Sequence, residues 1–245
     1  GEHNGEQMKD GDPIGDLMAG MFASVGILAA VRHQIQTGEG QFIDIGMLDT
    51  HVAWLANQGM NYLSTDKNPE RLGNQHPNIV PYQVMPTADG YIVLSIGNDP
   101  TFERFCELAG ETKLLEDDRF KTNASRVSNR EHVTKVLNEV TRRKTSNQWL
   151  SELEKAKIGC GPINNLSDVF NDPHVISREM VMEMEHSKTG EKPLKLISNP
   201  IKMNETPVSY RYAPPLLGEH TNEILKTELN LDEDQIKLLK DKKII

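Results

Sequence analysis

The sequence has 245 residues, 37% of them hydrophobic and 26% charged, and this balance indicates a folded chain rather than a disordered one. A formal net charge of -9 and dispersed basic residues argue against a nucleic-acid-binding protein. Cys106 and Cys160 lack His or Cys neighbours at ligand spacing, so we expect free thiols in a reducing compartment rather than a zinc site or a disulfide framework.

A long helix is predicted over residues 12–36, with Asp12-Pro13 as its start signal and Thr37-Gly38 as its stop signal. Its apolar stretch, 17–31, is shorter than the roughly 20 residues that cross a bilayer, so we predict a buried core helix and no membrane contact. Asp16 falls in the first turn, where the helix-end amides favour its charged form. The same position suits an ordinary capping or dipole-matching aspartate.

Further elements are predicted in chain order. A short strand is expected at 41–45, a helix at 47–63 and a polar loop or linker at 64–81. A hairpin turning at Asp89-Gly90 should then open a smaller unit. The remaining predicted elements are helices at 102–109, 128–142 (with a capping box of Ser128 and Glu131), 146–154, 220–228 and 232–241, and short strands at 159–163, 181–185 and 194–197.

Five groups of short motifs follow one another across nearly the whole chain. They are Asp16-Leu-Met-Ala-Gly20 with Thr37-Gly-Glu-Gly-Gln-Phe-Ile-Asp44, Arg71-Leu-Gly-Asn-Gln-His-Pro77 with Pro81-Tyr82, Asp89-Gly-Tyr-Ile-Val93 with Gly97-Asn98, Gly161-Pro-Ile-Asn-Asn165 with Asp172-Pro173, and Pro214-Pro-Leu-Leu-Gly-Glu-His-Thr221. In this order they resemble the class III CoA-transferases of the formyl-CoA and carnitine-CoA type.

The resemblance implies an α/β fold of which this chain is the C-terminal part. It implies an incomplete Rossmann-like large domain that begins at 1–50, a helix and linker at 51–80, a small α+β domain at 81–185, and a return to the large domain at 186–245. It further implies an N-terminal half ahead of Gly1 that supplies most contacts to coenzyme A. The two subunits of such a protein interlock as a homodimer.

The resemblance also implies a chemistry, because the family's aspartate at the position of Asp16 attacks the thioester of an acyl-CoA. Coenzyme A would then enter as the acyl-CoA substrate, a carboxylic acid would be the acceptor, and no metal would take part. Glycine-rich loops offer backbone amides for an oxyanion. The residues expected to bind substrate are Gly73, Asn74, Gln75, His76, Gly97 and Asn98. Each has a plain alternative as a turn glycine, a structural side chain or a helix start.

Three functions stay open on the sequence. The first is CoA transfer between short carboxylic or dicarboxylic acids, and the segments 161–165, 181–186 and 214–218 look most like members that use succinyl-CoA and a dicarboxylate such as glutarate. The second is an α-methylacyl-CoA racemase-like enzyme with Asp16 as a general base. The third is an incomplete chain that is inactive alone. We expect a cytoplasmic location, or a mitochondrial one if a transit segment precedes Gly1.

Overall fold

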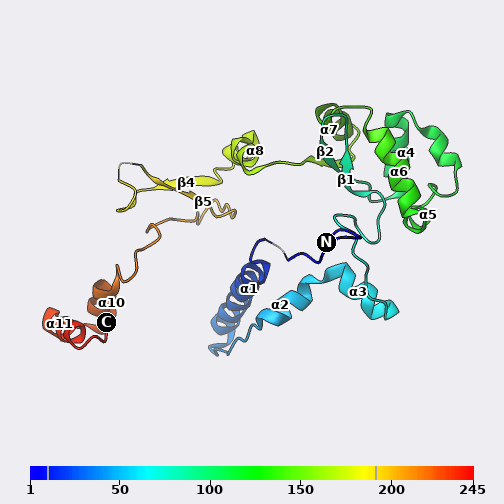
Figure 1. Ribbon diagram of the computed structural model, residues 1–245. Coiled ribbons are helices and arrows are strands. Elements are labelled where there is room, and N and C mark those ends of the chain that lie inside the picture. The colour runs from blue at the N-terminus through cyan, green and yellow to red at the C-terminus, as the bar shows by residue number, and fades with distance from the viewer. Residues whose placement is uncertain (10, 191) are drawn as a thin grey trace. The chain divides into compact units, whose positions relative to one another are not determined.

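The computed structural model describes residues 1–9, 11–190 and 192–245. It divides the chain into two units, Gly1–Ile163 and Asn164–Ile245, each with its own internal packing (Figure 1). Helices and strands occur in both units, which confirms the mixed α and β fold class. The four predicted domain segments, with boundaries at 50, 80 and 185, stay a prediction.

Three helices open the first unit: α1 (Ile14–Thr37), α2 (Met47–Trp54) and α3 (Ala56–Thr65). Helix α1 ends where its stop signal predicts, at Gly38, whose φ of 81° is a left-handed conformation that glycine adopts without strain. Helix α2 packs against α1. The prediction of one continuous helix in the second position was wrong, because the backbone turns at Ala56, which has a φ of 45°.

The apolar face of α1 has little cover among the described residues. Gly15 is the buried residue of this helix, and the side chains of Leu28 and Ile35 are 69% and 80% exposed. With 24 residues and a hydropathy of 1.8, α1 is long and apolar enough to cross a membrane, although the core helix of a soluble protein has the same profile. The length argument from residues 17–31 was therefore wrong, and the expected burial is not seen in the described chain.

Residues 41–45, predicted as a strand, do not form one in the described structure. A strand is stabilised when a neighbouring strand takes up its N–H and C=O groups. The two sheets of the described residues are built by other segments, and Phe42 is 91% exposed. This segment has strand-like sequence without a partner.

An antiparallel sheet forms the centre of the rest of the first unit. Strands β1 (Tyr82–Pro86) and β2 (Tyr91–Ser95) make the predicted hairpin, and β3 (Gly159–Pro162) pairs with the other edge of β2. In the hairpin turn, the carboxylate of Asp89 accepts hydrogen bonds from the Ser146 N–H at 2.8 Å and the Thr87 hydroxyl at 3.1 Å. The turn is thus joined to the helix that begins at Ser146.

Helices share the core with this sheet. They are α4 (Asp99–Ala109), the 3-10 helix η1 (Thr112–Glu116), α5 (Asn123–Ser128), α6 (Arg130–Thr141) and α7 (Ser146–Lys155). Apolar side chains from all of these layers meet in one cluster, which includes Ile92, Leu94, Phe102, Phe105, Leu137, Trp149 and Leu153. Burial of these side chains is the main stabilising contribution to the unit.

The capping box predicted from Ser128 and Glu131 was wrong. Thr122 caps an earlier helix by accepting the Ser125 N–H, and that helix, α5, already runs through Ser128. Helix α6 then begins at Arg130 without a side-chain cap. The polar pattern marked a junction between two helices rather than the start of one.

The second unit contains two short helices, a hairpin and two further helices. These are α8 (Leu166–Asn171), α9 (Pro173–Ser177), β4 (Val181–Met184), β5 (Leu194–Ile197), α10 (Thr221–Leu229) and α11 (Glu233–Asp241). The hairpin and the last two helices confirm the sequence predictions. Helices α8 and α9 were missed, although Asn165 and Asp168 form a capping box at the start of α8.

Candidate active site

Asp16 lies in the first turn of α1 and is exposed. Helix α1 begins after Pro13, and no side chain caps it. Within the described chain, the carboxylate of Asp16 forms no hydrogen bond or ion pair. The positive end of the helix dipole stabilises a negative charge at this position. Asp16 is thus an exposed carboxylate at the positive end of a helix, without a partner among the described residues.

The backbone beside Asp16 is covered by a histidine from α2. A Cβ atom added to Gly15 would lie 2.9 Å from Cε1 of His51 and closer still to its Nε2. A residue larger than glycine would therefore have to displace the ring. Sequence reasoning missed His51, because the contact joins two helices and no local pattern marks it.

The loop with the predicted substrate-binding residues follows α3. Gly73 has a φ of 59°, a conformation that favours glycine. The side-chain oxygen of Asn74 accepts the Val84 N–H at 2.7 Å, which holds the loop against β1. The side-chain oxygen of Gln75 accepts a hydrogen bond from Arg130 at 3.4 Å. Both amide side chains thus shape the loop, and their contact with substrate stays a prediction.

His76 has a well-defined environment. Its ring stacks on the Tyr82 ring, with 5.2 Å between centroids and an interplanar angle of 4°. Its Nδ1 accepts a hydrogen bond from the Asn78 N–H at 3.1 Å, so the neutral ring carries its hydrogen on Nε2. Burial, followed by the positive charge of Arg130, lowers the pKa of His76 from its ordinary value. At neutral pH this side chain is a hydrogen-bond donor without charge.

The second predicted loop, Gly97-Asn98, leads into α4. The side-chain oxygen of Asn98 accepts hydrogen bonds from the Thr101 N–H at 2.9 Å and the Thr101 hydroxyl at 2.8 Å. Asn98 is therefore the N-cap of α4, the plain alternative that the sequence offered. Substrate binding by its side-chain N–H groups, or by the Gly97 backbone, stays a prediction.

A buried arginine joins the two loops, and the sequence analysis missed it. Arg126 donates to the carbonyl oxygens of Val80 at 2.7 Å and Phe120 at 2.8 Å, and to the carboxylate of Asp99 at 2.9 Å. Its side chain is fully buried, with the guanidinium carbon 4.3 Å from the centre of the Phe102 ring. No local signal marks it, because its partners Val80 and Asp99 lie 46 and 27 positions away in the sequence.

The structure brings the two predicted loops together, but it shows no hydrogen bond between either loop and Asp16 in the described residues. The Ile96 N–H donates to the Pro81 carbonyl oxygen at 3.0 Å, so the segments before Tyr82 and after Ser95 lie side by side. In the described residues, no hydrogen bond or ion pair links Asp16 to either loop. The predicted site residues therefore form one cluster and one separate carboxylate.

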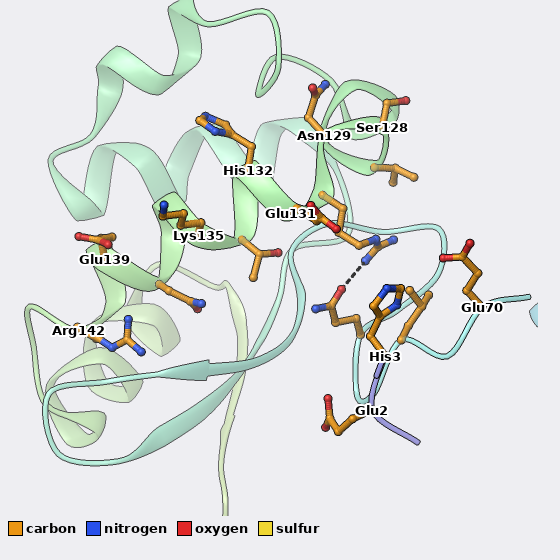
Figure 2. A pocket seen from close by; sticks show the side chains of 16 residues that line it. Glu2, His3, Glu70, Ser128, Asn129, Glu131, His132, Lys135, Glu139 and Arg142 are labelled. Carbon is orange, nitrogen blue, oxygen red and sulfur yellow. Dashed lines mark hydrogen bonds between the residues drawn. The ribbon is translucent and has the colours of Figure 1, made fainter. Parts of the chain in front are cut away.

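An open pocket of about 960 Å³ borders this cluster on the side of α6. Figure 2 shows that charged side chains of both signs line it, among them Glu131, Lys135, Glu139 and Arg142. Of the predicted substrate-binding residues, Gln75 is the one in its lining. Neither in this pocket nor in the rest of the described ranges is a group of three or more His, Cys, Asp or Glu side chains arranged to hold a metal ion.

Comparison with known proteins finds matches along most of the chain. The family model described as CoA-transferase family III matches residues 1–221. The succinate–glutarate CoA-transferase of Agrobacterium fabrum is 39% identical over 225 residues, which are 92% of this chain and 56% of that protein. The human succinyl-CoA:glutarate CoA-transferase is 36% identical over 236 residues, which are 96% of this chain and 53% of that protein.

A solved structure is similar as well. The crystal structure of a CAIB/BAIF family protein from Brucella suis is 36% identical, with a TM-score of 0.71, and the match covers 95% of this chain and 59% of that one. The chain thus spans a little more than half the length of the relatives it matches.

Proposed function

Because the chain belongs to CoA-transferase family III, we propose that the whole protein moves coenzyme A between dicarboxylic acids through a covalent intermediate on Asp16. The names of the bacterial and human relatives, which pair succinate or succinyl-CoA with glutarate, support short dicarboxylates as the substrates. These names are also why we favour transfer over racemisation. The acyl-CoA donor and the free acid acceptor are then the two partners in each turnover.

The proposed chemistry starts from the carboxylate of Asp16. One of its oxygens attacks the carbonyl carbon of the donor thioester. The C–S bond breaks, the CoA thiolate departs, and a mixed anhydride of Asp16 and the acyl group remains on the enzyme. The thiolate then attacks the Asp16 carbonyl carbon and releases the first acid as a carboxylate. Asp16 now carries CoA as a thioester.

The second half of the reaction repeats these steps in reverse with the acceptor. Its carboxylate attacks the aspartyl thioester and expels the thiolate, which then attacks the acceptor's carbonyl carbon and frees Asp16. No proton is consumed overall. Each intermediate would be lost to water, so the site must exclude solvent and stabilise an oxyanion. The Gly73 N–H already donates to the Gly1 carbonyl oxygen at 3.0 Å, so we assign that role to the backbone amide that follows Gly73 and to those near Gly97. We assign carboxylate binding to the side chains of His76, Asn74, Gln75 and Asn98.

The observation that carries this proposal is the setting of Asp16. Its carboxylate is exposed in the first turn of α1 and has no hydrogen-bond partner in the described chain, so its oxygens are available to attack. The family match over residues 1–221 supports the same assignment.

We also propose that the protein works as an interlocked homodimer without membrane contact, in the cytoplasm or the mitochondrion. The support is the apolar surface of α1, which needs a cover. Helix α1 carries Asp16 and Arg32 within its length, and charged side chains inside a bilayer are costly. Protein is therefore the better cover. A monodisperse monomer of the whole protein in light scattering would contradict the dimer.

An assay of the whole protein tests the activity. Succinyl-CoA and glutarate are mixed with the protein, and the CoA esters are separated and identified by mass spectrometry. We expect glutaryl-CoA and free succinate, with a monocarboxylate such as butyrate giving less product. Failure with every acid, combined with racemisation of a 2-methylacyl-CoA, would replace transfer by the racemase alternative.

A further inference from the structure

Arg130, the first residue of α6, forms hydrogen bonds to the loop on both sides of His76. Its Nη2–H donates to the Pro77 carbonyl oxygen at 2.7 Å, and its Nη1–H donates to the Gln75 side-chain oxygen at 3.4 Å, the bond drawn dashed in Figure 2. The arginine is half-buried, so these contacts are partly exposed to water. One side chain therefore positions both neighbours of the histidine.

The ring of His76 is held from two more directions. Tyr82 of β1 stacks on one face, and the Asn78 N–H donates to Nδ1. The side-chain nitrogen Nδ2 of Asn57 in α3 lies 3.5 Å from Nε2, and because it is itself a donor it does not accept the hydrogen on Nε2. The hydrogen on Nε2 is therefore available to another acceptor, such as an oxygen of a carboxylate.

Protonation of the ring would work against this arrangement. It would place a hydrogen on Nδ1 directly against the Asn78 N–H, and it would add a positive charge facing Arg130. The titratable groups that act on the ring are Tyr82, which stacks on it, and Arg130, whose charge faces it. The tyrosine is neutral over the pH range in which a histidine titrates. The hydrogen bonds of Arg130 to the loop and its positive charge both favour the neutral form of His76.

We propose that Arg130 is a positioning residue: it holds residues 75–77 so that the Nε2–H of His76 is directed to the carboxylate of the acid substrate. The substrate half of this statement rests on the proposed function. The tautomer and the charge of His76 do not. Arg130 itself acts through the loop and touches no reacting atom.

The test combines nitrogen NMR of His76 with kinetics, both on the whole protein, using Arg130→Gln. In the variant, we expect the Nδ1 chemical shift to differ from that of a hydrogen-bonded acceptor. We also expect His76 to titrate at a higher pH than in the parent protein. We also expect KM for the acid acceptor to rise about tenfold, as for the loss of one hydrogen bond to a charged group, with a smaller change in kcat. An unchanged tautomer and titration would overturn the proposal whatever the activity.

Two further variants separate position from charge. Arg142→Gln removes the same charge from the same pocket, where the Arg142 guanidinium makes no hydrogen bond to the described residues, and should leave the His76 spectrum and KM unchanged. Arg130→Lys keeps the charge but not the pair of hydrogen bonds to Gln75 and Pro77. It should therefore preserve the titration of His76 and still raise KM for the acid acceptor. If Arg130→Gln does not fold, an unchanged KM in Arg130→Lys overturns the proposal. If the parent protein shows no CoA transfer, the proposed function fails, and the NMR result still decides the role of Arg130.

Discussion

The imidazole of His51 lies against the backbone of Gly15, the residue directly before Asp16. This contact joins α2 to the first turn of α1, next to the candidate nucleophile. Glycine is the residue that allows it, since a Cβ atom at this position would overlap the ring. The identity of residue 15 is thereby linked to that of residue 51.

Gly15→Ala should therefore destabilise the chain by about 1 kcal/mol or more, as expected for overpacking, and should reduce transfer by displacing Asp16. Denaturant unfolding and the CoA-transfer assay measure the two effects. The double variant with His51→Ala should recover both.

Gly20→Ala is the matched control in the same helix. A Cβ atom at Gly20 meets nothing within 4 Å in the described chain, so this change should be neutral or stabilising through helix propensity. Equal losses in Gly15→Ala and Gly20→Ala would show that the His51 contact is not the cause.

Arg126→Met should lower the free energy of unfolding by about 3 kcal/mol, because the carbonyls of Val80 and Phe120 lose their donor in a buried site. Chemical denaturation monitored at Trp149, which is buried in the same core, is suitable. Arg143→Gln, which removes an exposed ion pair with Glu111, is the control and should cost less than about 1 kcal/mol. A small effect of Arg126→Met would contradict its role as the link between the two loops.

The stability contributed by Asp89 should depend on pH. The Ser146 N–H holds the pKa of Asp89 below its ordinary value of 3.8, so the carboxylate binds its proton less readily in the folded state than in the unfolded state. Its contribution is present above pH 3.8 and is lost as the pH falls through the folded-state pKa. Asp89→Asn should thus lower the thermal midpoint at pH 7, and the difference should shrink in acid. A constant difference would contradict this origin.

Cys106 should resist alkylation in the native state. Burial raises its pKa to about 12, so almost no thiolate is present at pH 8. Iodoacetamide should modify the half-buried Cys160 first and Cys106 only after unfolding, as peptide mass mapping would reveal. Rapid native labelling of Cys106 would show that this part of the core opens.

Local signals predicted much of the fold. The Asp-Gly turn of the hairpin and the glycine after α1 are signals of one or two residues, and each element forms where expected. Predictions that depended on distant partners did worse. Residues 41–45 have the composition of a strand, but a strand forms only beside another one.

The candidate site shows the same limit. Motifs with known counterparts pointed to Asp16 and to the loop of His76, because residue type and order are visible in the sequence. Arg126, Arg130 and His51 were missed, since their contacts join segments that are far apart along the chain. Nothing local distinguishes a buried arginine from an exposed one.

The central claim is that Asp16 carries the covalent intermediate, and one measurement tests it most directly. The whole protein is incubated with succinyl-CoA without acceptor, treated with hydroxylamine, digested and analysed by peptide mass spectrometry. We expect the modification on the peptide that contains Asp16, and both the modification and transfer should be lost in Asp16→Asn. That variant should still fold, because a first-turn aspartate contributes only about 0.3 to 1 kcal/mol. A modification on another peptide, or full transfer by Asp16→Asn, would contradict the account.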